Sequence, residues 1–252
     1  TLNERSQPTE VRVPADPRRI AVADMAVLDT LDAWGLTERI VALTQSTPVP
    51  YLAKYFEKSP KVTNIGTLKE LDLEALMASE PDIIFISGRL AKKYKELSRI
   101  APVVYMSVDR NAGSLASFSK NLLNLSKIFH LEARARQHIA RLDSRLARIR
   151  TAAQGSSALV GLVTSADVNL LGNSARCSLI GNEFGFTNIA AKANANHGNE
   201  SSFELLLKLN PDYFFVLDRD SAIAKPGARL ARDILANDLV ARMKAHQNNR
   251  IV

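Results

Sequence analysis

The sequence predicts an α/β protein with two lobes, each built on a mostly parallel sheet, joined by one long backbone helix. Three observations predict this fold. Short apolar runs alternate with longer helical patterns, one stretch of sequence recurs 130 residues later, and a helical segment without Pro or Gly separates the two copies. The chain has 252 residues, 46% hydrophobic and 23% charged, which is typical of a globular protein and not of a disordered one.

Six apolar runs predict buried strands. None of them alternates apolar with polar residues, as expected for parallel strands that helices cover on both faces. The runs span residues 19–23, 39–43, 82–87, 103–106, 158–163 and 212–217.

The segment from Ser114 to about Arg150 contains neither Pro nor Gly, and its apolar residues recur in steps of three and four, the period of a helix. We interpret it as one helix, which at 1.5 Å per residue would be about 55 Å long. The alternative is two helices with a break near His130. The prediction divides the chain into a lobe over 1–113, a connecting helix over 114–152 and a second lobe over 153–252.

An internal repeat supports the two lobes. Residues 71–89 align without gaps to residues 201–219. Each copy has the pattern of a short amphipathic helix, a Pro-Asp pair that ends it, a buried strand and then an arginine. In open parallel sheets, ligands bind outside the carboxyl ends of the strands, where Arg89 and Arg219 are expected. These two arginines are therefore candidate ligand-binding residues, with capping of a surface loop as the alternative.

The formal net charge of +7 favours an anionic partner. The basic residues are dispersed and no nucleic-acid-binding motif accompanies them, so we expect no nucleic acid partner.

The single cysteine, Cys177, excludes an internal disulfide. The sequence contains no nucleophile elbow, phosphate-binding loop or zinc-protease motif, so we expect no enzymatic activity. A chelatase-like enzyme is the alternative of this class.

Several segments, in this order and spacing, resemble the periplasmic siderophore-binding proteins of ABC importers, and within them the catecholate subfamily that handles enterobactin-type siderophores. The segments are 17–22, 28–36, 64–70, 86–89, 196–198 and 211–219. The resemblance implies capture of a ferric catecholate siderophore and its delivery to an inner-membrane ABC permease. It also implies a periplasmic or lipid-anchored protein without an intrinsic cofactor, and we expect a monomer. Haem, a hydroxamate siderophore or a corrinoid are the alternative ligands.

The resemblance also implies a set of binding residues. Arg89, Arg176 and Arg219 would line a basic cleft, and guanidinium groups suit catecholates because they stay charged and donate several hydrogen bonds. His197 would coordinate the iron of a siderophore that supplies only four oxygens. The tyrosine that accompanies this histidine in the subfamily has no match before Val252, where a further strand is expected to start, so we expect the second lobe to be incomplete.

Two acidic residues are candidates for docking to the permease. Glu74 and Glu204 occupy equivalent places in the two copies of the repeat. In the wider family one acidic residue on each lobe contacts the permease, so the resemblance implies this role for both glutamates. The alternative is that they are ordinary surface residues of a helix.

Overall fold

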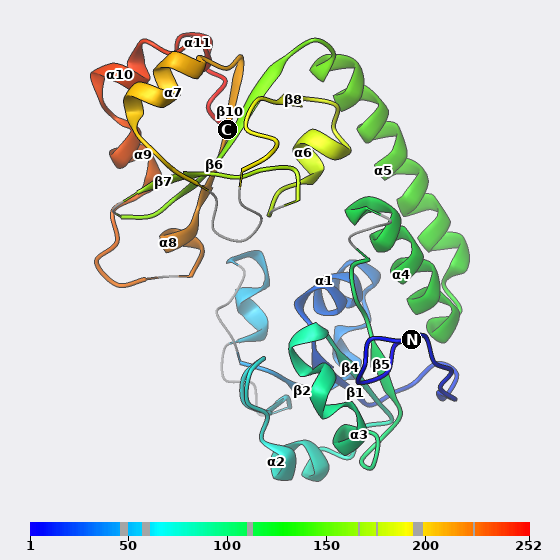
Figure 1. Cartoon of the computed structure of the whole chain (residues 1–252). Coiled ribbons are helices and arrows are strands. Elements are labelled where there is room, and N and C mark those ends of the chain that lie inside the picture. Colours follow the sequence, from blue (N-terminus) through cyan, green and yellow to red (C-terminus); the bar gives the residue numbers. More distant parts are fainter. Residues whose placement is uncertain are drawn as a thin grey trace. The chain divides into compact units, whose positions relative to one another are not determined.

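The computed structural model describes residues 1–45, 50–56, 61–109, 113–165, 167–174, 176–193, 199–223 and 225–252. They form two compact units, Thr1–Ile139 and Ala140–Val252 (Figure 1). Each unit has its own sheet and its own buried apolar clusters, which is the anatomy of a domain.

The first unit is built on five parallel strands in the order β3-β2-β1-β4-β5. All residues of β1, β4 and β5 are buried, because helices cover both faces of the sheet. Four predicted strands are thus confirmed, and the short β3 had no predicted counterpart. The strands are β1 (Ile20–Ala23), β2 (Ile40–Leu43), β3 (Thr63–Asn64), β4 (Ile83–Ile86) and β5 (Val103–Tyr105).

Helices form a layer on each face of this sheet. Alternate residues of β1 point to opposite faces, so Ile20 and Val22 pack with α1 and α4, while Ala21 and Ala23 pack with α2 and α3. The helices are α1 (Met25–Trp34), α2 (Leu73–Ala78), α3 (Tyr94–Leu97) and α4 (Ser114–Phe129), with 3-10 helices η1 (Thr37–Arg39), η2 (Pro50–Tyr55) and η3 (Gly88–Lys93).

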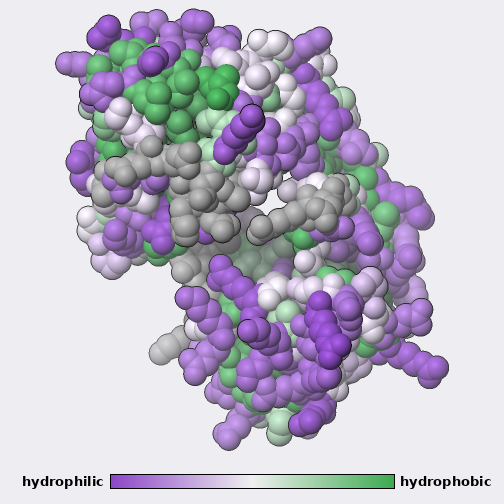
Figure 2. Space-filling model, in the orientation of Figure 1, coloured by the Kyte–Doolittle hydropathy of each residue, from purple (hydrophilic) through white to green (hydrophobic). Residues whose placement is uncertain are grey.

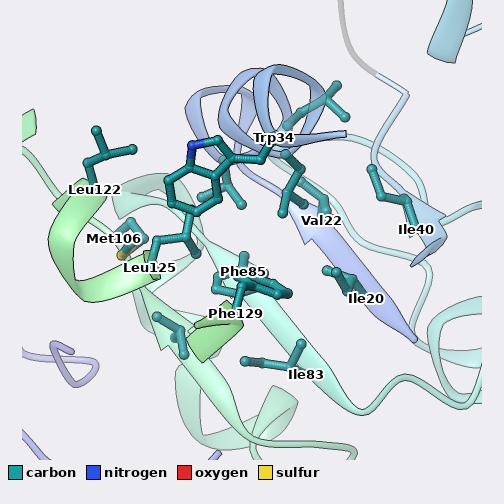
Figure 3. Close-up of a cluster of buried hydrophobic side chains, with 14 of the residues drawn as sticks. Ile20, Val22, Trp34, Ile40, Ile83, Phe85, Met106, Leu122, Leu125 and Phe129 are labelled. Atoms are coloured by element: carbon teal, nitrogen blue, oxygen red, sulfur yellow. The ribbon is translucent and has the colours of Figure 1, made fainter. Parts of the chain in front are cut away.

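The core under α1 and α4 holds the single tryptophan. The Trp34 side chain packs with Leu122 and Leu125 of α4 and is only 4% exposed (Figure 3). Gly35 follows with φ +70, and its N–H donates to the carbonyls of Leu31 and Asp32, which ends α1 in the left-handed conformation that glycine adopts readily. Trp34 therefore lies at the end of α1 that is remote from the carboxyl end of β1.

The expected single helix over 114–152 is wrong, and the alternative with a break near His130 is correct. The segment forms α4 and a separate helix, α5 (Glu132–Ala153). His130 adopts φ 55, and its N–H and that of Leu131 both donate to the carbonyl of Ser126, a hydrogen-bond pattern that ends a helix. The two compact units meet after Ile139, inside α5, so the connector is a helix of 22 residues, about 33 Å long.

The second unit has a mixed sheet in the order β10-β6-β7-β9, with β8 also pairing with β6. β8 and β10 run parallel to β6, whereas β7 is antiparallel to β6 and to β9. The predicted strands at 158–163 and 212–217 are confirmed, and the other three had no predicted counterpart. The strands are β6 (Ser157–Val163), β7 (Val168–Leu170), β8 (Thr187–Asn188), β9 (Asn199–Ser201) and β10 (Tyr213–Asp218).

Short helices complete this unit. Phe214 of β10 is fully buried, and Gly161 of β6 leaves room for its ring, since a Cβ there would lie 2.7 Å from it. Hydrophobic side chains gather on the surface over α7 and the elements beside it (Figure 2). Ile251 forms an isolated parallel bridge with Phe214. The helices are α6 (Leu179–Asn182), α7 (Phe203–Leu209), α8 (Arg219–Ala222), α9 (Ala231–Leu235), α10 (Asp238–Ala241) and α11 (Lys244–Gln247).

Candidate ligand-binding site

The two copies of the sequence repeat fold alike. Each copy begins with a residue that caps the N-terminus of its helix, Asp72 for α2 and Ser202 for α7. The side chain of each cap accepts a hydrogen bond from the backbone N–H of the residue three positions later. Each helix leads to a residue with φ 44, Glu80 in one copy and Asn210 in the other. A proline follows in both copies and prevents the helix from continuing.

The aspartate after that proline ties its strand to the neighbouring parallel strand. Asp82 Oδ2 accepts hydrogen bonds of 2.9 and 2.8 Å from the N–H groups of Arg18 and Arg19, directly before β1. Asp212 Oδ2 accepts hydrogen bonds of 2.9 and 2.7 Å from the N–H and hydroxyl of Ser157, at the start of β6. The repeat thus builds an equivalent pair of parallel strands in each unit.

Two predicted arginines follow the carboxyl ends of these strands. Arg89 is the second residue of η3, just beyond β4, and Arg219 is the first residue of α8, just beyond β10. Both side chains are exposed to solvent. Each arginine therefore lies just beyond the carboxyl end of a parallel strand in its own unit, and its role in ligand binding stays a prediction.

A buried carboxylate, which the sequence reasoning missed, lies beside Arg219. Asp220 is fully buried and Oδ2 accepts hydrogen bonds from the N–H of Ser165 at 2.9 Å and from its hydroxyl at 2.7 Å. Lys225 Nζ lies 3.1 Å from the same oxygen, and Arg219 Nη1 lies 3.4 Å from Oδ1. The Ser165 hydrogen bonds, helped by Lys225, lower the pKa of Asp220 to about 2. This cluster adds Lys225 to the cations near the carboxyl end of β10; Ser165 and Asp220 are too far apart in sequence for a motif to reveal them.

Arg176 and His197 are the other two predicted ligand-binding residues. Arg176 is exposed and follows β7. Since β7 runs antiparallel to β6, Arg176 is not at the carboxyl end of a parallel strand as Arg89 and Arg219 are. His197 belongs to 194–198, outside the described residues. Its predicted contact with iron therefore stays a prediction.

The two predicted docking glutamates occupy matching positions. Glu74 lies in the first turn of α2 and Glu204 in the first turn of α7, and both are exposed. Hydrogen bonds from the backbone and from Ser202 at the start of α7 lower the pKa of Glu204. Both carboxylates are therefore accessible to a partner that approaches the helix N-termini.

A pocket of about 220 Å³ lies at the carboxyl edge of the first sheet. It is bounded by α1, by α4 and by the residues that follow β1, β4 and β5, including Ser87 and Gly88 directly before Arg89. The sequence reasoning missed it because its walls come from four stretches of the chain that only the fold brings together.

Two features are absent from the part of the chain that the structure describes. No helix there has the length and apolar character needed to cross a membrane. The same residues contain no group of three or more His, Cys, Asp or Glu side chains that could hold a metal ion.

Comparison with known proteins identifies the family. Residues 20–252 match the family model described as periplasmic binding protein. The chain belongs to this family. Its members are binding proteins, and the two α/β units with parallel strands described above have the family's fold.

Relatives of this periplasmic binding protein include several with solved structures. The petrobactin-binding protein YclQ of Bacillus subtilis is 31% identical over the whole chain and 79% of its own length. Its crystal structure matches with a TM-score of 0.88, covering 100% of this chain and 87% of that one. The periplasmic catecholate-siderophore binding protein VctP of Vibrio cholerae is 30% identical with a TM-score of 0.85, covering 96% and 86%.

Proposed function

We propose that this chain captures a ferric siderophore of the catecholate type outside the cytoplasmic membrane and delivers it to an ABC permease. The observation that carries this proposal is an arginine after the carboxyl end of an equivalent strand in each unit of a periplasmic binding protein. The names of the relatives support the ligand class, since YclQ is a petrobactin-binding protein and VctP a catecholate-siderophore binding protein. A further relative, BauB, 25% identical with a TM-score of 0.81, was solved with acinetobactin and ferric iron.

The chemistry of the arginines suits this ligand. A ferric catecholate complex is anionic and carries flat aromatic rings. The guanidinium groups of Arg89, Arg176 and Arg219 stay charged at all working pH values, donate several hydrogen bonds to oxygens and stack on rings. The side chains of Arg89 and Arg219 are exposed, so they are accessible to the chelate. Charge attraction of this kind weakens as salt is added.

We assign iron coordination to His197 when the siderophore supplies only four oxygens. A neutral imidazole is a good ligand for iron, and two coordination positions of an octahedral ferric ion stay open in such a complex. For a siderophore with six donor oxygens these positions are filled, and His197 then has no iron to bind. Its importance should therefore depend on the number of oxygens that the siderophore offers.

Delivery requires a docking surface, and we assign this role to Glu74 and Glu204. Equivalent positions on equivalent helices suit a permease with two related subunits. Beside Glu74, α2 also borders an open groove of about 730 Å³ with Leu73 and Met77 in its wall. Met77 is 59% exposed, which offers a partner an apolar contact next to the charge.

A ligand titration tests the proposed function. Purified protein is titrated with a panel of ferric catecholate and ferric hydroxamate siderophores, haem and a corrinoid, with Trp34 as the fluorescent reporter. Because Trp34 is buried at the far end of α1, about 15 Å from the carboxyl end of β1, we expect quenching by energy transfer rather than by contact. Saturable quenching by the ferric catecholate, with little response to the iron-free compound, is the expected result. Tighter binding of haem or the corrinoid would contradict the proposal.

A further inference from the structure

The pocket at the carboxyl edge of the first sheet has apolar walls and an inner end within the core. Val27 of α1 and Leu122 and Leu125 of α4 form part of its wall. Leu122, Leu125 and Met106 lie together on one side of the Trp34 indole (Figure 3). All three also line the pocket. The pocket is therefore continuous with a hydrophobic core and favours apolar groups.

Its outer rim leaves large apolar side chains in contact with solvent. Val108, which follows β5, is 54% exposed, and Phe118 of α4 is 40% exposed. Both line the pocket. Two such side chains beside one opening form an apolar surface that a ligand can cover.

The charge of the pocket differs from that of the arginines. Its lining residues, as far as the structure describes them, include one acidic side chain, Asp24, and no basic one. Asp24 Oδ1 caps α1 by accepting a 2.9 Å hydrogen bond from the N–H of Val27. An anionic catecholate oxygen would therefore meet a carboxylate and apolar carbon here, and no cation to pair with.

We infer that this pocket takes the uncharged aliphatic linker of the siderophore, and not the iron-chelating end. The inference rests on the proposed function and deepens it. Gly88 lines the pocket and Arg89 follows it in the chain, so a linker in the pocket leaves the anionic end near Arg89. A volume of about 220 Å³ suits a short aliphatic chain, since an apolar cavity of about 150 Å³ already holds a molecule of the size of benzene.

Filling the pocket tests the inference. Ala26 lines it and is exposed, so Ala26→Phe places a ring at the opening without crowding the core. Ala33→Phe is the matched control, because Ala33 is an exposed alanine of the same helix, two turns away, that does not line the pocket. Val108→Thr, which makes the rim polar at nearly constant volume, is a second variant that does not depend on how the new ring packs.

Two ferric complexes with the same chelating groups serve as probes. One is the complex of a bis(catecholamide) with an aliphatic diamine linker, and the other is the complex of catechol itself, which has no linker. Ala26→Phe should weaken binding of the first about tenfold and Val108→Thr about threefold, as expected for lost apolar contact. Neither variant should change the affinity for the second complex, and Ala33→Phe should change neither affinity.

The possible failures are distinguishable. If the unmodified protein binds neither complex, the proposed function itself is wrong. If it binds both, and Ala26→Phe and Val108→Thr leave the linker complex unaffected, the proposed function stands and the pocket inference is overturned. Equal weakening of both complexes would also overturn it, because the chelating end would then occupy the pocket.

Discussion

Ser165 holds Asp220 through two hydrogen bonds, from its N–H at 2.9 Å and its hydroxyl at 2.7 Å to the same carboxylate oxygen. The same pair of distances joins Ser157 to Asp212 at the other end of β6 and β10. The two strands are thus fixed in register at both ends. Because Asp220 directly follows Arg219, the hydrogen bonds between Ser165 and Asp220 also determine where Arg219 leaves the sheet.

The first prediction concerns acid stability. The pKa of Asp220 is lowered from 3.8 to about 2 in the folded protein. A lowered folded-state pKa means that the ionised carboxylate stabilises the fold above pH 3.8, and that this contribution is lost as the pH falls towards 2. Asp220→Asn should therefore lower the free energy of unfolding at neutral pH and flatten its decline over this range. Urea denaturation at a series of pH values measures both effects.

Asp233→Asn is the control for this prediction. Asp233 lies in α9 with a side chain that is 55% exposed, so its replacement should leave the pH profile close to that of the unmodified protein. A profile for Asp220→Asn that falls as steeply as that of the control would contradict the assigned role of Asp220.

The second prediction concerns the aspartate of the repeat. Asp82→Ala removes the acceptor of two N–H groups before β1, which should reduce the free energy of unfolding by about 1–2 kcal/mol. Chemical denaturation followed by circular dichroism gives this value. Glu70→Ala, an exposed acidic residue before α2, controls for the loss of a negative charge. Equal losses in the two variants would show that the hydrogen bonds of Asp82 contribute nothing.

The third prediction separates docking from ligand binding. Glu74→Lys and Glu204→Lys reverse exposed charges in the first turns of α2 and α7, on other segments than Arg89 and Arg219. We expect unchanged affinity for the ferric siderophore, and stimulation of the permease ATPase reduced about tenfold or more in the double variant. Reconstituted permease in vesicles provides the assay. Normal stimulation by the double variant would remove both glutamates from the docking surface.

The sequence predicted the strands that are continuous and apolar, and missed those that are short. β1, β2, β4, β5, β6 and β10 were expected because each is a continuous apolar run in the sequence. β3 and β8 have two residues each, too few for a pattern, and pairing with their neighbours creates them. One continuous helix was preferred over a break near His130 because His130, and not glycine, adopts the left-handed conformation there.

The site was predicted in part for a similar reason. The repeat placed Arg89 and Arg219 because each is adjacent in sequence to the strand that positions it. The hydrogen bonds between Ser165 and Asp220 join residues that are distant in the chain. The same is true of the pocket lined by Val27, Leu122 and Val108, so no local sequence pattern marks either feature. The contributions of Arg176 and His197 remain predictions that the resemblance supplies.

The most direct measurement of the central claim is the affinity for a ferric catecholate siderophore of the double variant Arg89→Ala/Arg219→Ala. Its control is Lys92→Ala/Arg232→Ala, which removes the same charge from exposed positions on η3 and α9. The account predicts that the first variant binds about a hundredfold more weakly, since each charged hydrogen bond contributes about 1.5–3 kcal/mol, and that the control binds nearly normally. Equal affinities of the two variants would contradict it.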